Sequence, residues 1–258
     1  MRTINRRTFT YSFLTLPLLG LSGCQTGPTQ SRPNNEVILD EDPPAPQVGE
    51  EFHYEHEGPK PFGDGETDHS GVRAVGTIAQ TGENQQFWEI QEVFETSRGI
   101  ISYLIDADYL LHRQLIVSDN GELTVEIQPA WPQRYLNLLP DESDSMRIVQ
   151  EYYQPEGDEP IARAQIDLDV TRSYDERIVT PEGAFLCRSF DAEMLYRMEA
   201  ADTRIRYTVN QRSYWSDQFS WFIREEYDFG PVQQGSQEVR PAYQCTSTLK
   251  EYFPPKAS

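Results

Sequence analysis

The residues best suited to coordination chemistry are three histidines near the start of the folded part of the chain. His53, His56 and His69 lie among seven Asp and Glu residues between positions 50 and 68. Imidazole and carboxylate groups are ligands for zinc and copper, so this acidic region is a candidate metal site. The alternative is that these side chains are solvated in a loop-rich entrance to the domain. Because the HExxH spacing and a partner cysteine pair are absent, we predict no bound metal and no cofactor.

The sequence offers no recognisable catalytic machinery. It lacks the Gly-x-Ser-x-Gly elbow of serine hydrolases, the P-loop and the glycine pattern of dinucleotide-binding folds. Its 42 acidic and 22 basic side chains give a formal net charge of −20, which would repel a phosphate backbone. We therefore expect a protein that is not an enzyme and does not bind nucleic acid.

The first two dozen residues carry an export signal. Three arginines precede a short apolar stretch, Phe13–Leu21, which is too short to span a membrane as a helix. The tetrapeptide Leu21-Ser22-Gly23-Cys24 that follows resembles the bacterial lipobox at every position. This resemblance implies cleavage after residue 23 and lipidation of Cys24, with acyl chains such as palmitate as the membrane anchor. Gln25, in place of Asp, implies the outer membrane, with the domain facing the periplasm.

The other two cysteines could form a disulfide. If lipid occupies Cys24, Cys187 and Cys245 remain in a compartment that permits disulfides. The alternative is two separate buried thiols, which behave as small apolar side chains. Spacing along the sequence does not decide between these alternatives, because a disulfide requires proximity in space.

The composition divides the chain into three parts. Residues 1–23 form the signal peptide, and residues 24–47 carry the lipidated cysteine and a polar, proline-rich linker. No hydrophobic period is present in this linker, so we expect a disordered or extended stalk. Residues 48–258 have a length that one β-rich soluble domain can occupy.

Period-two alternation of apolar and polar residues dominates the domain and predicts antiparallel strands with one buried face. The clearest examples lie at residues 162–170, 190–198 and 204–209. Asn120-Gly121 separates two alternating runs and predicts a hairpin. The segment 103–111 suits a strand or a helix, as short apolar runs often do, and the segment 131–139 suits a short helix or an apolar loop. We expect a mainly β fold, a single curved antiparallel sheet or half-barrel with little helix.

The last third of the domain resembles a known group. A Gly183-Ala184-Phe185 turn leads into the strand that bears Cys187, and Tyr214-Trp215 and Ser247-Thr248-Leu249-Lys250-Glu251-Tyr252 follow. This order resembles periplasmic domains related to the Lol-type lipoprotein carriers, over roughly residues 175–255. The resemblance implies a half-barrel whose concave side can hold an acyl chain or another apolar guest. The usual glycine-rich turn after the aromatic pair is replaced by Ser216–Ser220.

Five aromatic residues could line such a cavity, or they could fill the core without a guest. They are Tyr207, Tyr214, Trp215, Trp221 and Phe222. We predict a membrane-anchored envelope lipoprotein that binds an apolar small molecule or an envelope protein. The rival prediction is an envelope hydrolase or metal-binding protein that uses the acidic region from His53 to His69.

Overall fold

The computed structural model describes residues 47–58, 69–81, 85–94, 99–118, 121–132 and 138–255, with backbone only for 69–81, 85–86 and Phe94. The predicted signal peptide, Cys24 and nearly all of the predicted stalk lie outside these residues. Within the described ranges all regular secondary structure is β-strand. No helix in this part of the chain is long and apolar enough to cross a membrane.

Fifteen strands are present in the described residues. They are β1 (Glu51–Glu57), β2 (His69–Thr81), β3 (Gln85–Phe94), β4 (Gly99–Asp106), β5 (Leu110–Ser118), β6 (Gly121–Pro132), β7 (Ser143–Tyr153), β8 (Ala162–Arg172), β9 (Glu176–Thr180), β10 (Gly183–Ala200), β11 (Thr203–Ser216), β12 (Trp221–Phe229), β13 (Val232–Gln234), β14 (Gln237–Arg240) and β15 (Tyr243–Phe253). The prediction of a mainly β, single curved antiparallel sheet is confirmed.

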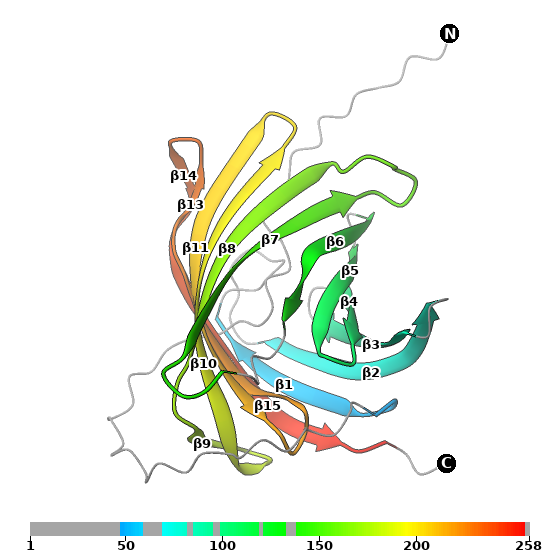
Figure 1. Ribbon diagram of the computed structural model, residues 1–258, viewed down its shortest axis with the longest axis vertical. Coiled ribbons are helices and arrows are strands. Elements are labelled where there is room, and N and C mark those ends of the chain that lie inside the picture. The colour runs from blue at the N-terminus through cyan, green and yellow to red at the C-terminus, as the bar shows by residue number, and fades with distance from the viewer. Residues whose placement is uncertain are drawn as a thin grey trace.

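The strands form one sheet in which every neighbouring pair is antiparallel. Strands β1 to β8 follow one another as a meander. The chain then passes through β9, which pairs with the first residues of β10, and the rest of β10 pairs with β8 on one edge and with β11 on the other. Strands β11, β12 and β15 lead back to β1. The sheet therefore curves around a common interior (Figure 1).

The ladder between β6 and β7 covers only part of the two strands, which part from each other beyond it. They pair only between residues 124–128 and 149–153, although β7 begins at Ser143. The pairing stops just before Pro129, which has no backbone N–H to donate to a ladder. The first half of β7 pairs with β8 alone. Figure 1 shows these two strands diverging.

The interior face of the sheet holds the hydrophobic core. In β8, every second residue from Ala162 to Arg172 is buried, as the sequence pattern predicts. The predicted hairpin is also present, since Ser118 of β5 pairs with Gly121 of β6 and Gly121 has a φ of 120°. If the pairing of a strand shifted by one residue, its buried side chains would turn to the outer face. Burial of one face therefore fixes the register of the strands.

The segment 103–111, which was ambiguous in sequence, is extended on both sides of a turn. The run from Tyr103 to Leu111 belongs to β4 and β5, with a turn between Asp106 and Leu110. Trp131 lies near the end of β6, and Leu138 is buried. Residues 133–137 between them lie outside the described ranges. The turn after Tyr214-Trp215 reverses the chain over residues 217–220, and the ladder shifts register between those two aromatic residues.

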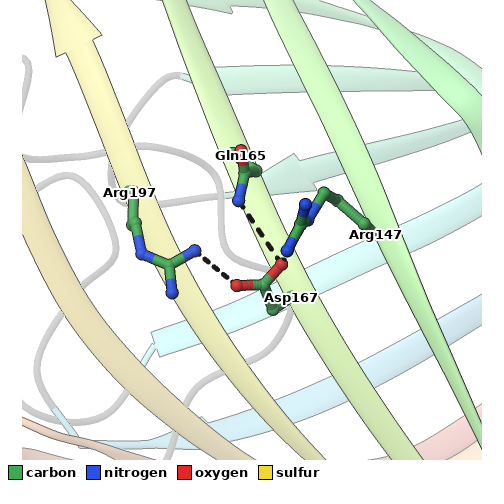
Figure 2. A network of polar contacts seen from close by, with 4 residues as sticks. All are labelled: Arg147, Gln165, Asp167 and Arg197. Carbon is green, nitrogen blue, oxygen red and sulfur yellow. Dashed lines mark hydrogen bonds and ion pairs between the residues drawn. The ribbon is translucent and has the colours of Figure 1, made fainter.

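The outer face of the sheet carries a charged network across three strands. Asp167 of β8 accepts hydrogen bonds from Arg147 of β7, at 2.7 Å, and from Arg197 of β10 (Figure 2). The hydrogen bonds from Arg147 and Arg197 lower the pKa of Asp167, with Arg147 as the larger cause. The side-chain oxygen of Gln165 accepts hydrogen bonds from the same two arginines, of 2.9 Å from Arg197 and 3.3 Å from Arg147. Exposed pairs of this kind usually contribute less than about 1 kcal/mol.

We predict that Asp167→Asn destabilises the domain by less than about 1 kcal/mol at neutral pH. The lowered pKa means that the folded state prefers the charged carboxylate, so the contribution is present above the ordinary Asp pKa of about 3.9 and is lost as pH falls through the folded value. Urea unfolding at pH 7 and pH 3 measures this difference between wild type and variant. A difference that grows on acidification would contradict the prediction.

Candidate functional site

The described interior contains a small pocket beside the opening between β6 and β7. Its apolar wall consists of side chains from four strands, and its polar end comes from β11 and β12. The lining residues are Trp131, Pro132, Leu168, Val170, Phe190, Ala192, Gln211, Ser213, Phe222 and Glu225. The volume is about 40 Å³. At roughly 10–15 Å³ for each water by this measure, the pocket has room for about three water molecules.

Strand register explains why these residues meet. Leu168 and Val170 face β7 at Met146 and Asp144, in the part of β7 that does not pair with β6. On the opposite side, Ala192 pairs with Gln211 and Phe190 pairs with Ser213. Residues two apart on a strand share a face, so both pairs point into the interior. Trp131, at the end of β6, closes the remaining side as a half-buried residue.

A buried carboxylate marks the polar end of the pocket. Glu225 is only 2% exposed. Its Oε1 atom accepts a hydrogen bond of 3.0 Å from the Tyr227 hydroxyl and one of 3.4 Å from the Gln211 amide nitrogen. The same nitrogen lies 3.1 Å from the Tyr227 hydroxyl oxygen. A buried charge is tolerated only when hydrogen bonds satisfy it, so this arrangement fixes the position of the carboxylate.

The polar end continues as a row across the interior face. Ser213 pairs with Glu225, Glu225 with Ser247, and Ser247 with His56 on β1. Ser247 and His56 are fully buried. The Ser247 hydroxyl has no hydrogen-bond partner within the described residues. Such a group costs about 1–3 kcal/mol when it stays unbonded, which makes a bound donor or acceptor near it favourable.

Three of the five predicted aromatic residues come together. Trp215 lies with its ring centroid 5.1 Å from Phe222 and 6.0 Å from Trp221. Across the interior, Tyr109 from the β4–β5 turn packs edge-on against Trp215 at 5.3 Å. Trp215 is fully buried and Tyr109 is 2% exposed. Of the five predicted residues only Phe222 is among those that line the described pocket, so Trp215 and Trp221 contribute to the packed core.

The other two predicted aromatic residues lie apart from the pocket lining. Tyr207 stacks on Tyr196 of β10, with ring centroids 4.7 Å apart. Burial raises the pKa of Tyr207 well above its ordinary value. Tyr214 is next to Trp215 on the same strand, so its side chain starts from the opposite face of the sheet. Arg212 lies over the Tyr214 ring at 5.7 Å.

Sequence reasoning missed the polar half of the pocket. Gln211 and Glu225 lie in strands whose apolar and polar residues alternate, and each is a polar residue at a position where the alternation places an apolar one. This departure from the pattern is the sequence signal that could have identified them. Tyr109 was also missed, because it lies in a turn and has a φ of 59°. This left-handed conformation is unusual for a large side chain and directs the ring toward the interior.

The sheet divides the candidate histidine residues, for which we predicted no bound metal. His53 and His56 are three residues apart on β1, and an odd separation on a strand places side chains on opposite faces. His53 is partly exposed and lies 3.4 Å from Glu51, whereas His56 is buried in the interior. The register places His69 opposite His56. Within the described residues no group of three or more His, Cys, Asp or Glu side chains could hold a metal ion.

The structure contains no disulfide between Cys187 and Cys245. Cys187 and Cys245 are both buried, and neither forms a disulfide. Cys187 is on β10 and Cys245 is on β15, and β11 and β12 lie between these strands. Three strand spacings of about 4.8 Å exceed the Cα separation of about 7 Å that a disulfide can bridge. Burial raises the pKa of the Cys187 thiol to about 12 and also raises that of Cys245.

We predict that both thiols are inert in the folded protein, because a buried thiol with a raised pKa forms little of the reactive thiolate. In the Cys24→Ala chain, iodoacetamide at pH 8 should modify neither cysteine before unfolding. Both should react in denaturant without reductant, as peptide mapping would show. Reaction in denaturant only after addition of reductant would instead demonstrate a disulfide.

Comparisons with known proteins give two structural neighbours. No protein-family model and no curated protein matches the chain. A candidate exported protein with a YmcC-like fold from Bacteroides fragilis is similar at 16% identity and a TM-score of 0.40, over 81% of this chain and 97% of that one. A candidate lipoprotein from Parabacteroides distasonis is similar at 12% identity and a TM-score of 0.40, over 80% and 96%.

Proposed function

We propose that this chain is an exported, membrane-anchored lipoprotein whose domain binds a small apolar ligand, or the end of a longer one, inside the curved sheet. The observation that carries the proposal is the pocket beside the parting of β6 and β7. Leu168, Val170 and Ala192 give it an apolar wall, and Gln211 and Glu225 give it a polar end. Sites with few polar groups in an apolar surround are typical of small-molecule binding.

The parting of the strands supports a route to this pocket. Trp131 is half-buried at the end of β6, whereas its neighbours across the pocket belong to the continuous ladder of β8, β10 and β11. An ordered ladder resists displacement because each shift breaks backbone hydrogen bonds. Movement of the Trp131 side chain breaks none of them, so we propose that the ligand passes this residue. A volume of about 40 Å³ fits a short alkyl group and not a whole acyl chain.

The binding role can be tested with an environment-sensitive apolar dye on the Cys24→Ala chain. We expect saturable binding that a short fatty acid or alcohol displaces. Ala192→Leu should weaken dye binding at least about tenfold, because the larger side chain occupies the pocket, a loss of about 1.4 kcal/mol. Ala200→Leu is the matched control, since it lies eight residues along the same strand. Equal binding by both variants, or no binding by the folded wild type, would contradict the proposal.

We propose that the domain acts as a binding module and not as an enzyme. Native mass spectrometry of the mature protein distinguishes the two roles that the sequence suggested. A co-purifying apolar molecule would support binding, and stoichiometric zinc or copper would support a metal-dependent protein. The resemblance to Lol-type carriers is part of the basis for expecting an apolar guest. An envelope protein could instead place one of its own apolar side chains in the pocket, and cross-linking would reveal that partner protein.

Anchoring through Cys24 at the outer membrane is also a proposal. We expect Cys24→Ala to abolish uptake of labelled palmitate and to move the protein from the membrane to the soluble fraction. The physical reason is that one acyl chain binds a membrane only marginally, whereas the two or three chains of a lipoprotein anchor stably. Ser22→Ala, which keeps a small residue before the cysteine, serves as the control. Continued palmitate uptake by Cys24→Ala would disprove the anchor.

A further inference from the structure

We infer that the open edge of β7 binds an extended, basic polypeptide segment as an added antiparallel strand, with one apolar side chain of that segment in the pocket. The pairing of the backbones goes beyond the proposed function, whereas the use of the pocket rests on it. The inference starts from residues 143–148, where β7 pairs with β8 alone. Such an edge presents backbone N–H and C=O groups with which a second chain can pair.

Two hydrogen bonds identify the backbone groups that face the open side. Just before β7, the Glu142 carbonyl oxygen accepts a bond of 3.0 Å from the Arg172 N–H of β8. Alternate residues of an antiparallel strand direct their backbone groups to the same side, so the even-numbered residues of β7 face β8. In agreement, the Ser145 N–H donates to Oδ1 of Asp144, at 2.8 Å. The exposed residues whose backbone groups face the open side are Ser143, Ser145 and Arg147.

The edge stays open because β6 lacks the donors that would cover it. Pro129 and Pro132 have no backbone N–H, and Trp131 and Pro132 pair with β5 alone. Strand β8 holds the open part of β7 extended, with a pair at every position from Ser143 to Ile148. The edge is therefore formed before any partner arrives, which lowers the ordering cost of binding.

The pocket lies directly beside this edge. Met146 pairs with Leu168 and Asp144 pairs with Val170, and both Leu168 and Val170 line the pocket. Residues opposite each other in a ladder share a face of the sheet. An added strand would therefore place one side chain beside Met146, at the pocket, and the next side chain on the same face beside Asp144. In strand addition the backbone pairs supply affinity, and pockets for alternate side chains supply specificity.

The charge along the edge favours a basic partner. Asp141, Glu142 and Asp144 are exposed acidic residues at its start, and no described Lys or Arg forms an ion pair with them. Arg147, the cation of the edge, is bound to Asp167 on the outer face. Two copies of this edge would repel each other, which argues against pairing of the chain with itself. A Lys or Arg side chain of a partner would be attracted.

The test begins with a selection from a phage-displayed library of random peptides on the full chain carrying Cys24→Ala. We expect enrichment of peptides with alternating apolar residues and with Lys or Arg beside them. A synthetic enriched peptide should bind in isothermal titration and should slow amide exchange of residues 143–147. The same peptide with N-methyl groups at the positions that face β7 should bind at least about tenfold more weakly, because the methyl groups replace the donors that pair with the edge.

Variants of the edge provide the matched comparison. Ser145→Pro removes one edge N–H at a position where proline is tolerated, and should weaken the peptide at least about tenfold while dye binding stays within about twofold. Ser145→Ala keeps the N–H and should bind as the wild type does. If Ser145→Pro fails to fold, Asp144→Lys should weaken the peptide at least about tenfold by repulsion. Glu238→Lys, at an exposed position of β14, is the control with the same change in charge.

The outcomes separate this inference from the proposed function. Loss of peptide binding in both Ser145→Pro and Ala192→Leu would support the edge and the pocket together. Peptide binding to the edge without any dye binding would support strand addition and overturn a small apolar ligand. No enrichment of basic peptides, or equal binding of the N-methylated peptide, would overturn the strand addition. Saturable dye binding that Ala192→Leu weakens would, in that case, still uphold the pocket.

Discussion

Replacing Trp215 with alanine should lower the free energy of unfolding by about 3–5 kcal/mol, the usual loss for a large aromatic side chain in a core. Trp215 is fully buried and contacts three rings, those of Tyr109, Trp221 and Phe222. Because Tyr109 belongs to a turn on the far side of the interior, the substitution also removes a link across the curved sheet. Urea denaturation followed by far-ultraviolet circular dichroism would measure the loss.

Trp131→Ala is the informative control for Trp215. Trp131 is half-buried at the edge of the pocket, so we expect a loss of stability of less than about 2 kcal/mol and a larger change in dye binding. This pattern would separate a residue that fills the core from one that borders the site. A Trp215→Ala protein of wild-type stability would mean that the aromatic cluster is loosely packed, and the assignment of Trp215 to the core would then be wrong.

Arg172→Met should destabilise the domain by about 3–5 kcal/mol, because it removes one partner of a buried ion pair. The Arg172 and Asp175 side chains are 2% and 0% exposed, and their charged atoms lie 3.0 Å apart. Arg172 also donates a hydrogen bond of 2.8 Å to the Leu138 carbonyl oxygen. Methionine keeps much of the volume but leaves the Asp175 carboxylate without this cation. Chemical denaturation at pH 7 would measure the effect.

The double variant Arg172→Met/Asp175→Asn tests the reason for that loss. If loss of the Arg172 cation beside the buried Asp175 carboxylate causes most of it, removal of that negative charge should restore part of the stability, and the two effects should not add. Arg147→Met is the control on the outer face, where the arginine side chain is 66% exposed, and it should cost less than about 1 kcal/mol. Additive losses in the double variant would show that lost packing, and not charge, explains the effect.

The sequence by itself determined the fold class and much of the strand register. Alternation at residues 162–170 and Asn-Gly at positions 120 and 121 are local signals, since burial of one face and a left-handed turn are decided by neighbouring residues. The short segments were less certain because a run of about eight apolar residues satisfies a helix and a strand equally. The aromatic residues were recognised as interior positions, but their division between core and pocket depends on what lies opposite them.

Only the tertiary structure decided which distant residues meet. Cys187 and Cys245 are separated by two intervening strands, and this order follows from how the strands pair, not from the 58 positions between them. The site arises in the same way. Gln211 and Glu225 lie on adjacent strands, but Trp131 reaches them only because the sheet curves and β6 parts from β7. Curvature of a sheet sums small twists over many strands, so no local run of residues encodes which side chains face each other across its interior.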